Sequence, residues 1–228
     1  MKNCSLSQEK LKLIACVTML ADHLGAVFFP GVPLRLIGRL SFPIYCFLLV
    51  EGVCHTRDTK KYGLRLLAGA MLAEIPFDLL FFGRLMLDHQ SVMVTLLLGF
   101  LYAVAARRMT AEGPRILLLL VFSLMGDLLK GDYGGCGVAM IGLFALTRDG
   151  SGKSWKQALG LAVLSWLIGG MKLRIGPLVI PIQVFSVAAL IPIGLYDGSK
   201  RTGSRWMQWV FYLFYPVHLV VMYMIATL

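Results

Sequence analysis

The chain carries ionisable side chains inside long apolar stretches near both ends of the sequence. Asp22 and His23 lie in the first stretch, and His218 follows Tyr215 and Pro216 in the last. A charge at the bilayer centre costs about 2.5–3.5 kcal/mol on insertion scales, so such residues usually serve a site. Histidine titrates near neutral pH, which suits a general base. These residues predict proton-transfer chemistry at a membrane-embedded site; a hydrogen-bonded core histidine is the alternative for each.

Further ionisable residues fall at a similar depth in their own apolar stretches. Glu74 and Asp78 are four residues apart, so they share one helical face, and Pro76 between them predicts a kink. Arg39 and Asp132 also count to the outer half of the membrane. We therefore expect one hydrated polar pocket. In the alternative interpretation, Arg39 pairs with Glu74 or Asp78 only to neutralise buried charge.

Two other histidines are interpreted differently. Glu51 and His55 are four residues apart and predict a separate pair toward the inner side. His89 stands beside Asp88 in a short outer loop, and we expect it to be solvated.

The composition of the chain predicts that membrane-spanning helices position these residues. With 58% hydrophobic residues and a mean hydropathy of +0.77 in 228 residues, the chain is predicted to be a polytopic membrane protein of the all-α class, a single domain over residues 1–228. About nine spans are expected, with Gly135–Thr147 short enough for a half-helix and the first span retained as an anchor. The spans are Leu11–Pro30, Leu34–His55, Tyr62–Gly83, Ser91–Ala106, Arg115–Lys130, Gly135–Thr147, Trp155–Met171, Leu178–Tyr196 and Trp206–Leu228.

The basic residues predict the orientation of the chain. Most of them fall in alternate loops, which the positive-inside rule assigns to the cytoplasm. The amino terminus is therefore expected to be cytoplasmic and the carboxyl terminus external. The cytoplasmic set is Lys2, Lys10, Lys12, Arg57, Lys60, Lys61, Arg65, Arg107, Arg108, Arg115, Arg148, Lys153, Lys156, Lys200, Arg201 and Arg205, against Arg35, Arg84, Lys130, Lys172 and Arg174 outside.

Charge and cysteines exclude other classes. The net charge of +10 resides in these loops and forms no continuous helical face, so we expect no nucleic-acid partner. The five cysteines are scattered and predict neither a disulfide framework nor a metal site.

Several motifs together resemble the TraX family of conjugation-associated proteins. The resemblance covers nearly the whole chain, and its motifs are specific only in combination. They are Met19–His23, Gly38–Ile44, Leu49–Gly52, Glu74–Leu79, Thr95–Gly99, Asp132–Gly134 and Phe211–Leu219.

The resemblance implies an acyltransferase of the bacterial inner membrane. The founding TraX acetylates the amino terminus of conjugative pilin with acetyl-CoA. Related integral-membrane acyltransferases carry an Arg, ten residues and a catalytic His, and this chain has Lys12 and His23 at that spacing. The expected reaction moves acetyl from cytoplasmic acetyl-CoA to an amine or hydroxyl of a peptide or envelope acceptor.

Residue roles follow as expectations. His23 is the expected base, with Asp22, His218 and Arg39 completing the catalytic set, and Arg39, Tyr133 or Tyr215 would stabilise the oxyanion. A covalent route through Cys16 or Cys46 stays open. The expected substrate-binding residues are Glu74, Asp78, Asp132, Tyr133 and Tyr215, and those for the phosphates of acetyl-CoA are Lys12, Arg57, Lys60, Lys61 and Arg65.

Two other functions compete with acetyl transfer. Mid-membrane His, Asp and Glu are also the parts of a proton-coupled transporter of small solutes, although no half-to-half repeat is apparent. A non-catalytic assembly factor for pili or conjugation would need no acetyl-CoA. In that case the loop cations reflect membrane topology alone.

Overall fold

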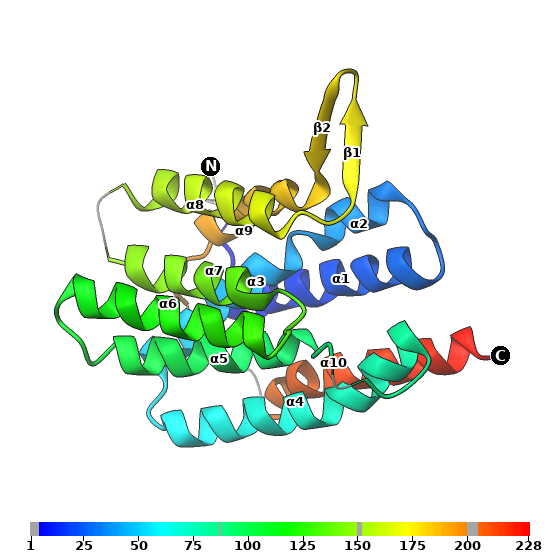
Figure 1. Cartoon of the computed structure of the whole chain (residues 1–228). Coiled ribbons are helices and arrows are strands. Elements are labelled where there is room, and N and C mark those ends of the chain that lie inside the picture. The colour runs from blue at the N-terminus through cyan, green and yellow to red at the C-terminus, as the bar shows by residue number, and fades with distance from the viewer. Residues whose placement is uncertain (1–4, 87, 150–151, 200–204) are drawn as a thin grey trace. The chain divides into compact units, whose positions relative to one another are not determined.

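In the part of the chain that the structure describes, the fold is helical apart from one short hairpin (Figure 1). The computed structural model describes residues 5–86, 88–149, 152–199 and 205–228, without the side chains of residues 175 and 205–208. The predicted all-α class is confirmed. In chain order the elements are α1 (Gln8–Val27), α2 (Val32–Gly38), α3 (Ser41–His55), α4 (Thr59–Phe82), α5 (Val92–Ala106), α6 (Glu112–Leu128), α7 (Gly134–Thr147), α8 (Lys153–Ile168), β1 (Lys172–Ile175), β2 (Leu178–Pro181), the 3₁₀ helix η1 (Ile182–Ala189), α9 (Leu190–Gly194) and α10 (Arg205–Ala226).

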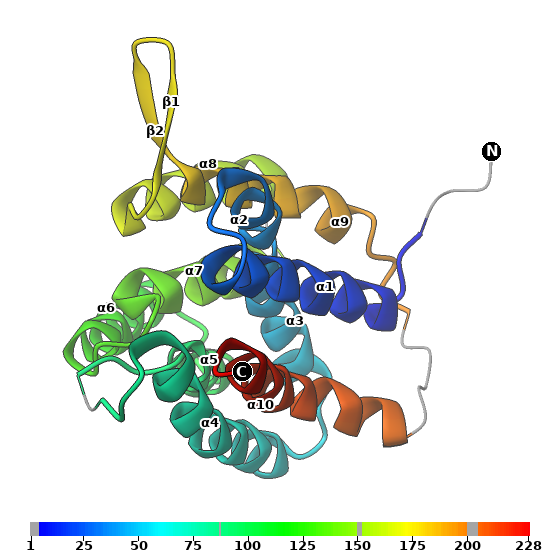
Figure 2. The same cartoon turned by 90° about the vertical axis from the view of Figure 1, so that its right-hand side faces the viewer.

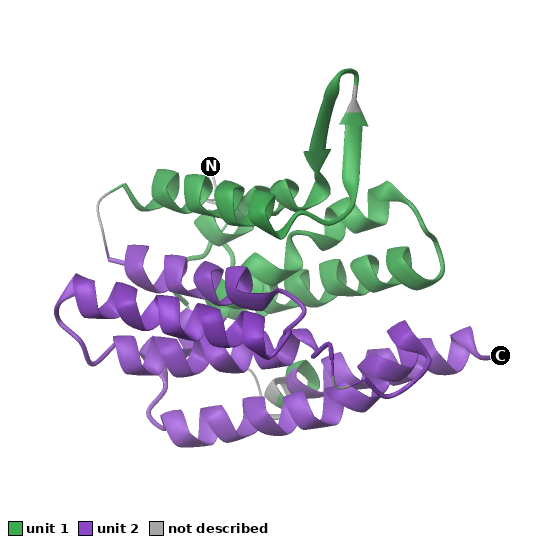
Figure 3. Cartoon of the chain, in the orientation of Figure 1, with its two compact units in different colours: residues 1–48, 151–211 green, residues 49–150, 212–228 purple. Residues whose placement is uncertain are grey.

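The chain divides into two compact units (Figure 3). Unit 1 comprises residues 1–48 and 151–211, and unit 2 comprises residues 49–150 and 212–228. In unit 1, α2 packs on α1, and η1 packs on α8. Pro33 lies in the first turn of α2, where its missing N–H costs no hydrogen bond. The short α2 therefore begins directly after the turn that follows α1.

A β-hairpin replaces the start of one predicted helix. The span expected over Leu178–Tyr196 begins instead with β2, which pairs antiparallel with β1, and continues as η1 and α9. The two strands are joined by Gly176 and Pro177, and Gly176 has φ +61°, a conformation that glycine adopts at low cost. Both views show the hairpin standing away from α8 and η1, across the direction of α1 and α8 (Figures 1 and 2).

Unit 2 is built around α5. Helices α4, α6 and α7 each pack against it, and α6 also packs against α7. Asp58 caps the start of α4 by accepting a hydrogen bond of 2.9 Å from the Lys61 backbone N–H. Pro76 lies inside α4 and Pro216 inside α10, and both helices continue through them.

The described helices carry membrane features. Two segments are long and apolar enough to cross a bilayer, Val32–His55 (α2 with α3) and Trp209–Ala226. In addition, large apolar side chains are exposed along several helices, a surface that marks membrane or protein contact. Examples are Leu64, Met71, Leu72 and Ile75 on α4, Leu117, Leu120, Leu124 and Leu128 on α6, and Leu159, Trp166 and Leu167 on α8.

These features indicate a membrane protein. The nine spans and the orientation of the termini stay predictions. Lys2, Lys200 and Arg201, which contributed to the predicted orientation, lie outside the described residues, as does the side chain of Arg205.

Candidate functional site

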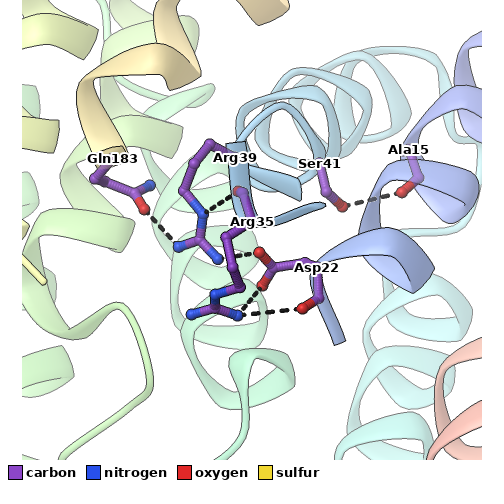
Figure 4. Close-up of polar contacts among 6 residues, drawn as sticks. All are labelled: Ala15, Asp22, Arg35, Arg39, Ser41 and Gln183. Atoms are coloured by element: carbon purple, nitrogen blue, oxygen red, sulfur yellow. Dashed lines mark hydrogen bonds and ion pairs between the residues drawn. The ribbon is translucent and has the colours of Figure 1, made fainter. Parts of the chain in front are cut away.

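Unit 1 contains a buried group of charged and amide side chains, the arginine cluster: Asp22, Arg35, Arg39 and Gln183 (Figure 4). Arg35 Nη1 donates to Asp22 Oδ2 at 2.8 Å, and Arg39 Nη2 donates to Asp22 Oδ1. Arg39 Nη1 also donates to Gln183 Oε1 at 2.7 Å. One carboxylate is therefore shared by two guanidinium groups, and an amide oxygen binds the second of them.

The junction of α2 and α3 positions this cluster. Gly38 ends α2, and a Cβ at this position would overlap the Asp22 carboxylate, so only glycine permits the close approach of α1 and α2. Arg39 follows at the cap, with its Nε donating to the Arg35 backbone oxygen at 3.2 Å. Ser41 Oγ, at the start of α3, donates to the Ala15 backbone oxygen of α1 at 3.0 Å. Gly38 and the hydrogen bonds at this junction thus hold both arginines next to Asp22.

The neutralising partner of Arg39 is Asp22, which the sequence interpretation did not consider. That interpretation pointed to Glu74 or Asp78, whose carboxylates instead accept backbone N–H groups. His23, next to Asp22 on α1, is half-buried, and its role as a base stays a prediction.

Unit 2 holds a second polar group, the carboxylate cluster: Glu74, Asp78, His89, Asp132 and Tyr215. Both Glu74 oxygens accept from the Ser91 backbone N–H, at 3.0 and 3.3 Å. Asp78 Oδ2 accepts from the Met86 N–H at 2.8 Å, while its buried Oδ1 has no hydrogen-bond partner among the described residues.

Three of the expected substrate-binding residues lie within electrostatic range of a fourth, Tyr215. Tyr215 is buried and interacts electrostatically with Asp132, Glu74 and Tyr133. The fifth residue, Asp78, interacts electrostatically with His89, as do Glu74 and Asp132. The predicted substrate set is thus brought together within unit 2, although its binding role stays a prediction.

Hydrogen bonds join the two loops of unit 2 that carry His89 and Asp132. The Gln90 N–H donates to the Lys130 carbonyl, and the Asp132 N–H donates to the Gln90 carbonyl, both at 2.9 Å. Lys130 also pairs with Asp88 at 2.9 Å. These bonds fix the chain before α5 against the chain before α7.

His89 is partly exposed, and it also has side-chain partners that the sequence did not predict. Its Nε2 lies 3.4 Å from Asp132 Oδ1, and its ring stacks on Phe77 with centroids 6.0 Å apart. The hydrogen bond to Asp132 raises the pKa of His89 above its usual value, against the opposing effect of partial burial. The two residues are 43 positions apart, so no local spacing could have revealed the pair.

His218 is held by its own helix. Its Nδ1 lies 2.8 Å from the Phe214 carbonyl, and its ring stacks on Phe214 with centroids 4.9 Å apart. Because a carbonyl can only accept, Nδ1 must carry the hydrogen and Nε2 is the basic nitrogen. His218 also lies 5.5 Å from the Tyr215 ring, which links it to the carboxylate cluster.

The predicted pair of Glu51 and His55 is confirmed, while its position on the inner side stays a prediction. His55 Nδ1 lies 3.6 Å from Glu51 Oε2, and Arg148 Nε lies 2.9 Å from Glu51 Oε1.

The residues expected to bind phosphate divide between the units. In unit 1, Lys12 Nζ lies 5.5 Å from the Phe211 ring centroid. In unit 2, Arg57, Lys60 and Lys61 are exposed at the start of α4, and the exposed Arg65 lies over the Tyr212 ring at 5.4 Å. Among the described residues, no group of three or more His, Cys, Asp or Glu side chains is arranged to hold a metal ion.

Comparison with known proteins assigns the family. The TraX protein family model matches residues 7–226. The probable fimbrial assembly protein FimC, serogroup H1, of Dichelobacter nodosus is 30% identical over 250 aligned positions, which cover 97% of this chain and 96% of that protein. The uncharacterized protein RP591 of Rickettsia prowazekii (strain Madrid E) is 39% identical over 41 residues, covering 18% of this chain and 16% of that protein. No solved structure matches. With a family match over nearly its whole length, the chain belongs to the TraX family.

Proposed function

We propose that this chain is a membrane-embedded acetyltransferase of pilus or conjugation-related assembly. It transfers acetyl from cytoplasmic acetyl-CoA to an amine or hydroxyl acceptor, with a pilin amino terminus favoured. Membership of the TraX family and the fimbrial assembly relative support the pilus-related role. Localisation in the bacterial inner membrane with multiple spans is part of the proposal.

The observation that carries the acceptor assignment is the carboxylate cluster. A free amino terminus is an ammonium ion at neutral pH, and carboxylates are its natural partners. The buried Asp78 Oδ1 accepts no hydrogen bond among the described residues, and Glu74 and Asp132 add negative charge nearby. These groups would hold the ammonium ion, and Tyr133 and Tyr215 would orient it.

The acceptor must lose a proton to attack the thioester. The ammonium ion first loses one proton, through the base, to solvent. Transfer then forms an N–C bond and breaks the C–S bond, and a second proton lost by nitrogen ends on the thiolate sulfur. His23 is the proposed base, and His218, with Nε2 as its basic nitrogen, is the second candidate. Arg39 would donate to the carbonyl oxygen as it gains charge, and Asp22 would hold Arg39 in place.

Acetyl-CoA supplies the activated acetyl group and several phosphates. The exposed Arg57, Lys60, Lys61 and Arg65 carry four positive charges around the start of α4, which fits phosphate binding. Lys12, in unit 1, is proposed separately as a phosphate-binding residue. Both arginines can bind phosphate through two N–H groups, whereas the lysines act as point charges.

The test uses purified protein in detergent, acetyl-labelled acetyl-CoA and a pilin-derived peptide with a free amino terminus. Label should move to this peptide and not to the same peptide blocked at its amino terminus. His23→Gln should abolish transfer, Asp78→Asn should weaken peptide binding, and Lys60→Ala/Lys61→Ala should raise the KM for acetyl-CoA. His55→Gln is the matched histidine control, since His55 belongs to the inner pair with Glu51.

The name of the Dichelobacter relative favours a second function, a non-catalytic assembly factor. In that case no label moves, and His23→Gln still restores pilus assembly in a deletion strain. Restoration by His23→Gln together with absent transfer would overturn the enzyme proposal.

A further inference from the structure

Gln183 has a buried side-chain amide whose oxygen is hydrogen-bonded and whose nitrogen is not, among the described residues. The residue is 2% exposed, and its Nε2 has no hydrogen-bond partner among the described residues. Its Oε1 accepts from Arg39 Nη1 at 2.7 Å, and a guanidinium group can only donate, which fixes which end of the amide faces Arg39. Figure 4 shows the amide oxygen on the Arg39 side and the nitrogen turned away from the bond. Leaving a buried N–H₂ group without an acceptor is unfavourable, so the presence of this amide indicates that Nε2 has a hydrogen-bond acceptor when the site is occupied.

The helix that carries Gln183 is held in place by a second polar contact. Gln183 and Ser186 are three residues apart on η1, and side chains with that spacing line up on one side of a 3₁₀ helix. Ser186 Oγ lies 2.6 Å from Ser165 Oγ of α8, and both residues are fully buried. This bond fixes the rotation of η1, and therefore the position of the Gln183 amide.

The surrounding groups define the chemistry of the missing partner. Both Asp22 oxygens are already taken up by Arg35 and Arg39, and the amide oxygen is taken up by Arg39. The Gln183 group that remains is a donor, and the cluster contains two guanidinium groups to one carboxylate. A ligand at this position must therefore accept hydrogen bonds, and negative charge favours it.

We propose that Gln183 Nε2 and the arginine cluster form a binding site for a small carboxylate-like oxyanion. The amide supplies a neutral donor, and the two guanidinium groups supply the positive charge. Arg35, whose side chain is 23% exposed, provides the more accessible edge, while the Arg39 side chain is 10% exposed. The site goes beyond acetyl transfer, since it assigns Gln183 a binding role with a ligand class of its own.

Gln183→Glu is the sharpest variant. Glutamate has the shape of glutamine and keeps an oxygen for Arg39, but it replaces the N–H₂ donor with a second carboxylate oxygen. The variant therefore carries its own anion in the site. A purely structural glutamine predicts that Gln183→Glu changes stability without changing any response to anions.

The experiment measures thermal unfolding of purified protein in detergent with sodium acetate, against sodium chloride at equal ionic strength. For wild type, the melting temperature should rise by about 3–6 °C at acetate concentrations near ten times the Kd. Gln183→Glu should melt at or above the wild-type temperature and lose the acetate response. Val138→Ala is the control: it should melt lower, because it removes two buried methyl groups from α7 of unit 2, yet keep the acetate response.

Two results would overturn the site: a wild-type protein with no acetate-specific shift, or a Gln183→Glu protein that keeps the full shift. Neither measurement needs acetyl-CoA or an acceptor peptide. A failure here is therefore distinct from a failure of the proposed acetyl transfer.

Discussion

Replacing Asp22 by asparagine removes the only carboxylate of the arginine cluster. Asparagine keeps one acceptor oxygen and loses the charge, so two largely buried guanidinium groups lose their counter-ion. The side chains of Asp22 and Arg39 are 12% and 10% exposed, which leaves little water to compensate. Breaking a buried ion pair in this way costs about 3–5 kcal/mol. We expect Asp22→Asn to lower the free energy of unfolding by that amount.

A double-mutant cycle separates the two arginines. Removing Arg39 or Arg35 by substitution with methionine, alone and together with Asp22→Asn, gives the coupling energy of each pair. We expect about 1–3 kcal/mol for the Arg39 pair and a smaller value for the Arg35 pair, because the Arg35 side chain is 23% exposed and better screened.

The assay is reversible unfolding in mixed detergent micelles, followed by tryptophan fluorescence. The reasoning is refuted if Asp22→Asn costs less than about 1 kcal/mol, or if Arg35 couples more strongly than Arg39. Loss of activity without loss of stability would move Asp22 from holding the arginines to direct chemistry.

Three further predictions concern packing, pH and a buried hydroxyl. Gly38→Ala should destabilise by about 1–3 kcal/mol because its Cβ overlaps a side chain of α1, whereas Gly113→Ala, with open space around it, should be neutral or stabilising; parallel unfolding curves compare them. The raised pKa of His89 means that its pair with Asp132 stabilises fully below the ordinary histidine pKa and is lost as pH rises through the folded value, so His89→Gln should flatten stability against pH in that window. Ser165→Ala should cost about 1–3 kcal/mol in the same unfolding assay, because the hydroxyl that it contacts in η1 is left buried and unpaired; an unchanged midpoint would contradict this.

Patterns within short stretches of the sequence predicted the features that depend on neighbouring residues, namely the helices and one side-chain pair. Long apolar runs identified the helices, and the four-residue spacing of Glu51 and His55 identified a real pair. The hairpin was missed because Leu178–Pro181 is apolar and continues into η1, so its composition is that of a membrane helix. Only the turn at Gly176 and Pro177 distinguishes it.

The contacts of the candidate site depend on tertiary structure that sequence spacing does not encode. Arg39 and Gln183 are 144 residues apart, and a neutral glutamine in an apolar run gives no charge signal. Asp22 and Arg39 are 17 residues apart across the turn between α1 and α2, so the pair depends on how α2 packs back on α1. The side chains that could do chemistry were therefore recognisable by type, while their partners were not.

The hairpin also fixes how deep unit 1 can sit in a bilayer. A two-stranded ribbon leaves one backbone edge of each strand unpaired, and hydrocarbon does not tolerate such edges. The boundary of the hydrocarbon must therefore run close to the points where the hairpin leaves the helices, after Ile168 of α8 and before Ile182 of η1. On this placement, we expect Lys172 and Arg174 at the level of the lipid phosphates and the exposed Leu167 among the acyl chains. The ribbon acts as a depth marker that any placement of this protein in a membrane must respect.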